Sequence, residues 1–425
     1  MNSTSGIVPR RVEPVIEQAM GRNPVVLLEG PRAVGKSTLL HVIADQRNGR
    51  VLDLDSEVVR EAVRQDPELE LDQTGLVCVD EYQKAPETLQ AMKFLLGGAE
   101  TPGRFLLAGS TRHAALPTGS QALTGRLNRR IIWPLAQSEI DGTAPDILAG
   151  LFQEPAAVVD ASRHRDGSSR HEYAARLVRG GFPIALRREE GEARDEWFDD
   201  YVALTLDRDA RELRKVRHAA MLPTLLGLLA PRTAQVVNIA RLASELGLPQ
   251  PTTREYTMLL ANAFLIRIIR PWNKVMTPRT FTKPKAFIVD SGVAASLLGA
   301  SDTSALGDPQ SPLSSQFGHL LETFVMGEVA KEVAWTPGLT LGGYWRTYDG
   351  AEVDIVLQNR RHQVVAIEVK AGRRSQPADF AGLKALREAT GEQFLAGVLL
   401  NTAAHGRPVE DRIYELPIDA LWRAD

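Results

Sequence analysis

An α/β fold with several domains is predicted by three features of this 425-residue sequence. An apolar run, Val25–Leu28, leads directly into a glycine loop and then into a helical pattern. A second apolar run, Leu76–Val79, ends in two carboxylates. Near the C-terminus, two alternating strands, Ala351–Gln358 and Gln363–Lys370, are joined by a polar turn. Short buried strands that alternate with helical patterns are typical of α/β sheets, in which ligands bind at the carboxyl ends of the strands.

The composition is that of an ordinary globular protein, and it limits the classes of function. Hydrophobic residues make up 44% of the chain and charged residues 24%, and the length predicts about two to four domains. A net charge of −3 gives no overall attraction to nucleic acid, so such a contact needs a local basic patch. The single cysteine, Cys78, excludes an internal disulfide and fits a reducing cytoplasm. We expect a cytoplasmic protein without a membrane partner, because neither a signal-type apolar core nor an apolar stretch of membrane-spanning length is found.

The glycine loop matches a phosphate-binding pattern. Gly30, Gly35, Lys36 and Ser37 fill the template G-x-x-x-x-G-K-[ST] between a strand and a helix. The glycines let backbone N–H groups approach phosphate oxygens, and the helix start adds unpaired N–H groups. We expect Lys36 to reach the β- and γ-phosphates of ATP and the Ser37 hydroxyl to ligate Mg²⁺, whereas an ordinary glycine turn leaves both residues unexplained. The predicted nucleotide-binding residues are Gly30, Gly35, Lys36, Ser37, Thr38 and Ser110.

Two carboxylates, Asp80 and Glu81, follow the second apolar run. Because ligands bind outside the carboxyl ends of strands in an open α/β sheet, these side chains are expected near the phosphates. Asp80 would hold the water shell of Mg²⁺, and Glu81 would orient or deprotonate the attacking water. The alternative is a solvated strand end, but the neighbouring phosphate loop favours the catalytic interpretation.

Further candidate residues for the ATP site follow the apolar run FLLAG (Phe105–Gly109) and, later in the chain, Gly125. Ser110 and Thr111 stand at the end of that run, where either could contact the γ-phosphate or simply form a turn. Arg126, Arg129 and Arg130 form a basic cluster. One of them, with Arg126 as the first candidate, would act as an arginine finger from a neighbouring subunit, so a homo-oligomer is expected. The alternative is a solvated basic turn.

The chain resembles a known family. It looks like the bacterial and archaeal ATP-binding proteins that combine an AAA-type ATPase core with a C-terminal domain labelled DUF4143. The segments that carry the resemblance are GPRAVGKST, VDEYQKAPE, LLAGSTRHAALP, LTGRLNRRIIWPLAQSE and KPKAFIVDSGVAASLLG. The resemblance covers nearly the whole chain and implies an ATPase followed by a small helical region, a winged helix and a nuclease-like end. Because the biochemical role of that family is poorly defined, the resemblance informs architecture more than function.

Gln235–Arg270 has the pattern of a winged helix: a short helix ended by glycine, a proline-started helix and an apolar strand. Thr253 and Arg254 are expected near the start of the recognition helix, and Lys274 on the wing. Such residues could contact DNA, because basic side chains neutralise phosphates. The alternative is a winged helix that serves only packing or protein contact. Further basic residues on or after the predicted wing are Arg267, Arg270, Arg279, Lys283 and Lys285.

The two C-terminal strands are expected to gather carboxylates on one face. A register that pairs Asp354 with Glu368 brings both carboxylates and Lys370 onto one surface, where a divalent cation would relieve the repulsion and Lys370 could activate water. This arrangement resembles the D…E-x-K core of PD-(D/E)xK nucleases, and Glu322 on the preceding helix matches the glutamate that many of them add. The alternative is a charged sheet face with ion pairs through Arg346 or Lys370. The predicted metal ligands are Ser37 and Asp80 for Mg²⁺ in the ATPase, and Glu322, Asp354 and Glu368 for Mg²⁺ or Mn²⁺ at this end.

The predicted architecture is therefore α/β with four regions. They are a P-loop AAA-type ATPase core (1–145), a helical lid or connector (146–230), a winged-helix-like module (231–285) and a C-terminal α/β PD-(D/E)xK nuclease-like domain (286–425). The first functional hypothesis is ATP hydrolysis coupled to action on nucleic acid, with DNA as the expected partner and metal-dependent cleavage as a further expectation. The second is an ATP-dependent switch or scaffold that binds DNA or protein with an inactive nuclease-like domain. The third is an ATPase regulator whose C-terminal domain drives oligomer assembly.

Overall fold

The computed structural model describes residues 6–98, 101–112, 123–163, 167–212, 220–273 and 283–423, with backbone alone at 209–212. The chain forms two compact units. The first is Met1–Leu135 with Asn262–Phe264, and the second is Ala136–Ala261 with Leu265–Asp425. Among the described residues, the first unit contains one sheet and the second unit contains two.

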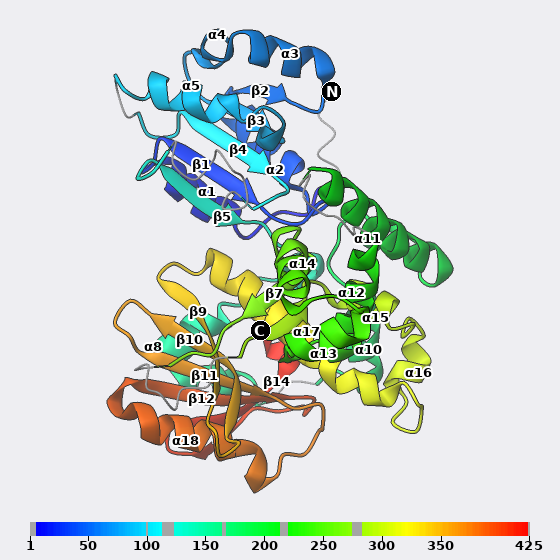
Figure 1. The fold of residues 1–425 in the computed structure, drawn as a ribbon. Helices are drawn as coiled ribbons and strands as arrows, with labels where there is room; N and C mark the ends of the chain where they lie inside the picture. The colour runs from blue at the N-terminus through cyan, green and yellow to red at the C-terminus, as the bar shows by residue number, and fades with distance from the viewer. Residues whose placement is uncertain are drawn as a thin grey trace. The chain divides into compact units, whose positions relative to one another are not determined.

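A parallel sheet forms the centre of the first unit (Figure 1). Its strands are β1 (Val25–Glu29), β2 (Arg50–Asp53), β3 (Val77–Asp80), β4 (Phe105–Gly109) and β5 (Leu127–Ile131). The helices of this unit are α1 (Glu13–Met20), α2 (Lys36–Gln46), α3 (Glu57–Gln65), α4 (Pro67–Leu71) and α5 (Glu87–Leu95). The strand order is β2-β3-β4-β1-β5, and every neighbouring pair is parallel. The α/β core predicted from the sequence is confirmed.

Strands β1, β3 and β4 are buried along their whole length. Their apolar side chains form one core with residues of α3, α4 and α5, as continuous apolar runs in a parallel sheet predict. Cys78 lies in the middle of β3 and is fully buried. Its burial raises the pKa of the thiol to about 12, with a smaller contribution from the Asp80 charge.

The second unit contains a separate, mixed sheet. Its strands are β9 (Leu339–Arg346), β10 (Glu352–Asn359), β11 (Val364–Val369), β12 (Phe394–Asn401), β13 (Arg407–Glu410) and β14 (Ile413–Pro417). The strand order is β13-β14-β12-β11-β10-β9, in which β12 is parallel to β11 and β14 while the other pairs are antiparallel. Helix α18 (Ala381–Thr390) packs against β10, β11 and β12.

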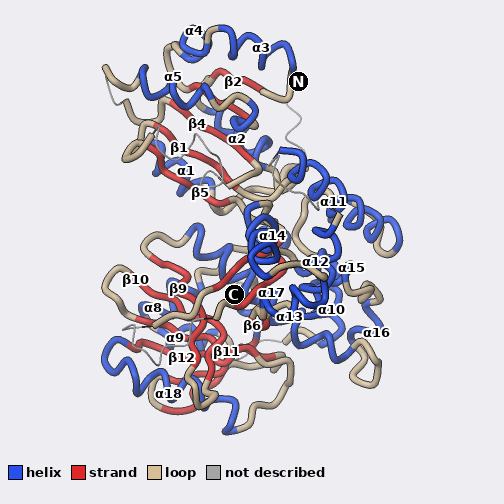
Figure 2. The backbone as a smooth tube through the Cα atoms, in the orientation of Figure 1, coloured by secondary structure: helices blue, strands red, loops and turns tan. Residues whose placement is uncertain are grey.

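The remaining helices belong to the same unit. They are α7 (Gln137–Asp141), α8 (Ile147–Gln153), α9 (Pro155–Ala161), α10 (Arg170–Arg179), α11 (Glu192–Glu212), α12 (Met221–Leu229), α13 (Ile239–Leu246), α14 (Gln250–Asn262), α15 (Ser291–Leu297), α16 (Thr303–Gly307) and α17 (Ser314–Trp335). Helices α10, α15 and α16 contact α17 (Figure 2). The region expected to form a helical lid or connector, 146–230, begins with α8 and α9, which contact β12 and β13. Within the described ranges, none of the helices has the length and apolarity that a bilayer crossing requires.

Helix α17 carries two buried glutamates that cap other helices. Glu328 accepts a hydrogen bond from the backbone N–H of Gln137 at 2.8 Å, and Glu332 accepts one from Leu148 at 2.7 Å. A carboxylate is favourable there because the first N–H groups of a helix have no intrahelical partner and carry the positive end of the dipole. Glu328 and Glu332 lie one turn apart on the same face of α17, so this face fixes α7 and α8 together.

Asp290 explains why residue 180 is a glycine. One carboxylate oxygen, Oδ1, accepts from the N–H groups of Gly292 at 2.9 Å and Val293 at 3.3 Å, which caps α15. The other, Oδ2, accepts from the N–H of Gly181 at 2.9 Å. Gly180 has a φ of 63°, and a Cβ at this position would lie 2.2 Å from Asp290 Oδ1. The backbone therefore approaches the carboxylate more closely than any other residue type allows.

A small antiparallel sheet combines one strand that precedes α13 and α14 with two strands that follow them. It is formed by β6 (Gln235–Val236), β7 (Ile266–Ile269) and β8 (Lys285–Ile288) in the order β6-β8-β7. After β7, the chain continues along the edge of β9, where the Trp272 N–H donates to the Tyr344 carbonyl at 2.6 Å and the Tyr344 N–H donates to the Arg270 carbonyl at 3.3 Å. The two sheets of the second unit are therefore joined by backbone hydrogen bonds.

Candidate functional site

The phosphate loop connects β1 to α2, as the sequence predicts. Gly35 has a φ of 92°, which favours glycine, and a Cβ on Gly30 would lie 2.1 Å from the carbonyl oxygen of Ile132. Both glycines are therefore required by the path of the backbone. Ser37 and Thr38 occupy the first turn of α2 and are exposed.

Lys36 is buried at the loop, with 5% of its surface exposed. Its Nζ donates to the carbonyl oxygens of Gly30 at 3.0 Å and Pro31 at 2.7 Å. Both acceptors are neutral. Because hydrogen bonds between an ammonium and phosphate are stronger than those to a neutral carbonyl, phosphate oxygens can replace these partners.

Asp80 and Glu81 lie together at the carboxyl end of β3. The Asp80 carboxylate hydrogen-bonds with the side chain of Ser37 and accepts from the N–H of Glu81 at 3.0 Å. Burial raises the pKa of Asp80, and the hydrogen bond with Ser37 opposes that rise. The structure thus brings the predicted Mg²⁺ ligands Ser37 and Asp80 into contact, and their hydroxyl and carboxylate oxygens are donors that suit this ion.

Glu81 is held by side chains from three segments. Its Oε2 accepts from Gln83 Nε2 at 2.5 Å and from Ser110 Oγ at 3.3 Å. Arg32 NH1, from the phosphate loop, lies 3.8 Å from the same oxygen. Ser110 therefore stands at the predicted catalytic carboxylate, at the end of β4. The contributions of Arg32 and Gln83 were missed by sequence reasoning, although both lie inside recognised motifs.

Arg126 lies elsewhere on the sheet. It precedes β5, whose first residue, Leu127, pairs with Val25, while its last residue, Ile131, pairs with Glu29 beside the phosphate loop. The length of β5 therefore separates Arg126 from the phosphate-loop edge by roughly 15 Å. Arg126 does not join Lys36 and Glu81 within one chain, so a catalytic role for it requires a second subunit.

The predicted register of the C-terminal strands is confirmed. Ile355 pairs with Ile367, and the same register continues to place Asp354 opposite Glu368. Asp354 Oδ2 also accepts from the N–H of Val369 at 3.0 Å. Both carboxylates line a pocket of about 660 Å³, together with Lys370, His319, Arg346 and Asp379.

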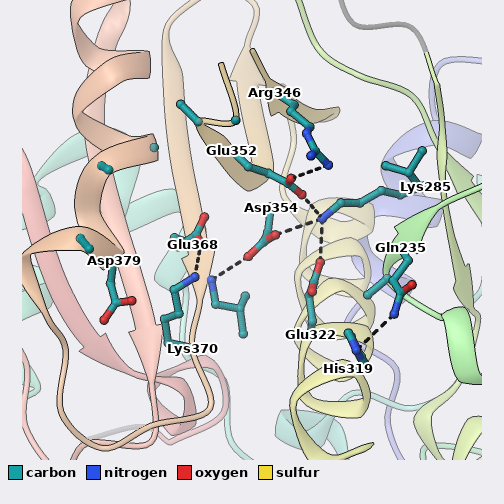
Figure 3. A pocket seen from close by; sticks show the side chains of 18 residues that line it. Gln235, Lys285, His319, Glu322, Arg346, Glu352, Asp354, Glu368, Lys370 and Asp379 are labelled. Carbon is teal, nitrogen blue, oxygen red and sulfur yellow. Dashed lines mark hydrogen bonds and ion pairs between the residues drawn. The ribbon is translucent and has the colours of Figure 1, made fainter. Parts of the chain in front are cut away.

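The ammonium group of Lys285 lies among three carboxylates of this pocket (Figure 3). Its Nζ lies 3.0 Å from Glu322 Oε1, 2.6 Å from Glu352 Oε1 and 3.1 Å from Asp354 Oδ1. Burial alone lowers the pKa of Lys285, but the three negative charges outweigh it and raise the pKa above the ordinary lysine value. The sequence placed Lys285 on an exposed wing; the structure corrects this, because its side chain is 4% exposed.

The remaining charges around the pocket are also paired. Lys370 Nζ lies 2.6 Å from Glu368 Oε1, and Arg346 NH1 lies 3.1 Å from Glu352 Oε2. Burial, with the nearby Asp354 charge, raises the pKa of Glu368 to about 8, although Lys370 opposes the shift. Burial and the same Asp354 charge raise the pKa of Glu322 well above its usual range.

The predicted metal ligands Glu322, Asp354 and Glu368 therefore line one pocket, but they meet lysines there. Among the described residues, no group of three or more His, Cys, Asp or Glu side chains has an arrangement that could hold a metal ion. The expected triad does not fit a metal in this arrangement, because an ammonium stands between Glu322 and Asp354. The alternative of ion pairs through Arg346 or Lys370 describes Glu352, which pairs with Arg346, and Glu368, which pairs with Lys370. The position of Lys285 among the carboxylates was not foreseen.

The residues predicted to contact nucleic acid differ in their exposure to solvent. Arg254 is exposed on α14, but Thr253 is fully buried and donates its hydroxyl to the Pro249 carbonyl at 3.1 Å, so its prediction as a contact residue is wrong for this arrangement. Lys274, like Arg279, lies outside the described residues. Arg267 is also buried and donates toward the Met326 carbonyl at 3.5 Å. Arg267 and Lys285 are therefore buried and cannot belong to the predicted basic surface patch.

Three family models match successive parts of the chain. The family model described as an AAA domain matches residues 22–141. The models described as Domain of unknown function (DUF8612) and Domain of unknown function (DUF4143) match residues 170–304 and 317–421. The chain therefore carries an AAA-type ATPase domain followed by a C-terminal DUF4143 domain, which confirms the resemblance read from its motifs.

Particular relatives cover most of the chain. Uncharacterized protein Rv2008c of Mycobacterium tuberculosis and Uncharacterized protein Mb2031c of Mycobacterium bovis are each 28% identical to it over 409 residues, which is 96% of this chain and 82% of the relative. Among solved structures, the Walker-type ATPase paby2304 of Pyrococcus abyssi is 15% identical and aligns with a TM-score of 0.41, covering 69% of this chain and 97% of that one.

Proposed function

We propose that the AAA domain hydrolyses ATP with Mg²⁺. The observation that supports this most directly is the meeting of Lys36, Ser37, Asp80 and Glu81 at the carboxyl edge of the parallel sheet. This edge is where open α/β sheets bind their ligands, and the helix start of α2 adds N–H groups for the phosphates.

Each of these residues has a distinct part in the proposed reaction. Lys36 exchanges its carbonyl partners for the β- and γ-phosphate oxygens. Ser37 and Asp80 would hold Mg²⁺, which would neutralise charge on the phosphates when bound. Glu81 orients a water and accepts its proton as the new P–O bond forms and the bond to the β-phosphate breaks, leaving ADP and phosphate. The contacts from Gln83, Ser110 and Arg32 set the direction of the Glu81 carboxylate.

Substitutions separate binding from hydrolysis. Lys36→Ala should weaken ATP binding strongly, because the phosphates lose their buried cation, whereas Glu81→Gln should bind ATP and fail to turn it over. A fluorescent ATP analogue measures the first property and phosphate release the second. Lys93→Ala, which removes an exposed lysine on α5, is the matched control and should keep both. Wild-type turnover in Glu81→Gln would remove that residue from the mechanism.

We further propose that the DUF4143 domain has a PD-(D/E)xK nuclease-like fold and that its partner is nucleic acid, with DNA as the first candidate. The support is the D…E-x-K set, Asp354, Glu368 and Lys370, on adjacent strands that line one pocket. The exposed Arg254, beside a helix, turn and hairpin that fit a winged-helix module, supplies positive charge.

The ion pairs of the C-terminal centre favour a switch or scaffold over a nuclease. Glu322, Glu352, Asp354 and Glu368 each face a lysine, so the side chains that would activate water are engaged with one another. We propose that ATP turnover, in a cytoplasmic homo-oligomer, changes how this protein holds DNA or a protein partner.

A nuclease assay tests this choice. Single-stranded DNA, double-stranded DNA and RNA are incubated with Mg²⁺ or Mn²⁺, with and without ATP. The switch or scaffold predicts no cleavage and DNA binding that weakens steeply with salt. Metal-dependent cleavage that is lost in Asp354→Asn establishes a nuclease instead.

A further inference from the structure

Lys285 satisfies every donor of its ammonium with a carboxylate. An ammonium has three N–H bonds, and the three oxygens of Glu322, Glu352 and Asp354 lie 2.6 to 3.1 Å from Nζ. The ring of Tyr344 lies 5.3 Å from the same nitrogen, where the face of an aromatic ring favours a cation. The surroundings of Nζ are therefore those of a dedicated cation site.

The backbone that carries Lys285 is fixed by independent contacts. Lys285 begins β8, the middle strand of its sheet, where it pairs with Val236 on one side and Ile269 on the other. At the other end of β8, the N–H of Ile288 donates to Thr233 Oγ1 at 3.1 Å, and Thr233 shares a hydrogen bond of 2.8 Å with Thr323, the neighbour of Glu322 on α17. The strand that supplies the cation is thus tied to the helix that supplies one of its carboxylates.

The cation and the carboxylates come from different parts of the chain. Lys285 belongs to the segment matched by DUF8612, while Glu322, Glu352 and Asp354 belong to DUF4143. A DUF4143 domain without its neighbour therefore has a group of carboxylates without their central charge.

We propose that the Lys285 ammonium stands in for a divalent cation in this acidic centre, so that the DUF8612 segment keeps the centre closed to metal. This inference deepens the proposed function of the C-terminal domain and rests on its nuclease-like character. A divalent ion placed among the same oxygens would need distances of about 2.0 to 2.6 Å to them and would stand beside the ammonium, at strong repulsion. Metal and Lys285 therefore exclude each other.

The substitution Lys285→Met tests this exclusion, because it removes the charge and keeps a similar unbranched side chain. Nucleotide-free protein is titrated with Mn²⁺, and bound ion is followed by electron paramagnetic resonance. Wild type should bind no Mn²⁺ at the C-terminal centre. Lys285→Met should gain a single Mn²⁺ site per chain at this centre. The gained ion should be lost again in the double variant Lys285→Met with Asp354→Asn.

Lys331→Met is the matched control. Lys331 is also buried and also pairs with a glutamate of α17, Glu328 at 2.6 Å, but it lies outside the pocket, so its loss should create no Mn²⁺ site. A folded Lys285→Met that gains no Mn²⁺ overturns the proposal. Should that variant fail to fold, wild type decides: Mn²⁺ bound by wild type and lost in Asp354→Asn overturns the proposal, and its absence supports it. Because the readout is metal binding, it is separate from the ATPase and nuclease assays.

Discussion

At the scale of single residues, two buried lysines differ in their partners and hence in their use. Lys36 donates to the neutral carbonyls of Gly30 and Pro31, which phosphate oxygens can replace. Lys285 donates to three carboxylates, and a phosphate would not offer it a stronger hydrogen-bond acceptor. Phosphate oxygens can therefore replace the carbonyl partners of Lys36, whereas the three donors of Lys285 already meet carboxylates of the protein itself.

Cys78 provides a prediction at this scale. Since the thiol is fully buried in β3 and its pKa is raised to about 12, the native protein should not react with a thiol reagent at mildly alkaline pH. After denaturation, the same protein should show one reactive thiol per chain, because Cys78 is the single cysteine. Rapid labelling of the native protein would show that β3 is not in the interior.

At the scale of elements, short polar contacts decide how helices are placed. Asp290 holds the start of α15 and the turn after α10 at once. This arrangement needs a backbone at Gly180 that has a positive φ and no Cβ. The junction of α10 with α15 is thus set by a single carboxylate and a single glycine.

Gly180→Ala should therefore destabilise the protein. The strained backbone together with the clash against Asp290 Oδ1 should lower the free energy of unfolding by more than about 2 kcal/mol, measured by urea denaturation. Gly227→Ala is the control, because it should change the free energy of unfolding in the opposite direction. Gly227 is exposed inside α12 and its new methyl group would meet nothing within 4 Å, so stability should rise by about 0.5 to 1 kcal/mol. Equal stability of Gly180→Ala and wild type would contradict the account of this junction.

The sequence predicted elements whose signals are local. The phosphate loop, the strand before Asp80 and the alternation around Asp354 follow from neighbouring residues, and the structure has them as expected. Lys285 was misplaced because its partners are distant in sequence, and only tertiary packing brings them together. Thr253 was misplaced for a related reason: a helix with polar residues on several sides does not reveal which of them faces the core. A lysine at the start of an otherwise apolar strand, KAFI, was the one available signal for a buried cation.

At the scale of the whole molecule, the ATP site of one chain lacks a nearby arginine finger at the predicted position. Arg126 lies before β5, away from the phosphate-loop edge, and so would serve the site of a neighbouring copy. In the proposed homo-oligomer, ATP turnover would therefore depend on contact between neighbouring chains.

Turnover per chain should then rise with protein concentration. Arg126→Ala and Lys36→Ala should each be inactive alone, and mixing them should restore part of the activity, because each supplies the half that the other lacks. Phosphate release, measured beside the mass of the assembly by light scattering, checks both statements. A strictly monomeric protein with full activity would exclude the trans arginine.

The strand-like pairing between Arg270–Trp272 and Tyr344 also bears on solubility. An uncovered strand edge presents unpaired N–H and C=O groups that can template pairing with other chains. Here the edge of β9 is paired at Tyr344 with the preceding segment of the same chain. A fragment that starts at Ser314 keeps β9 but loses this cover, and with it α8 and α9. Such a fragment should aggregate through its exposed edge more readily than the full chain does.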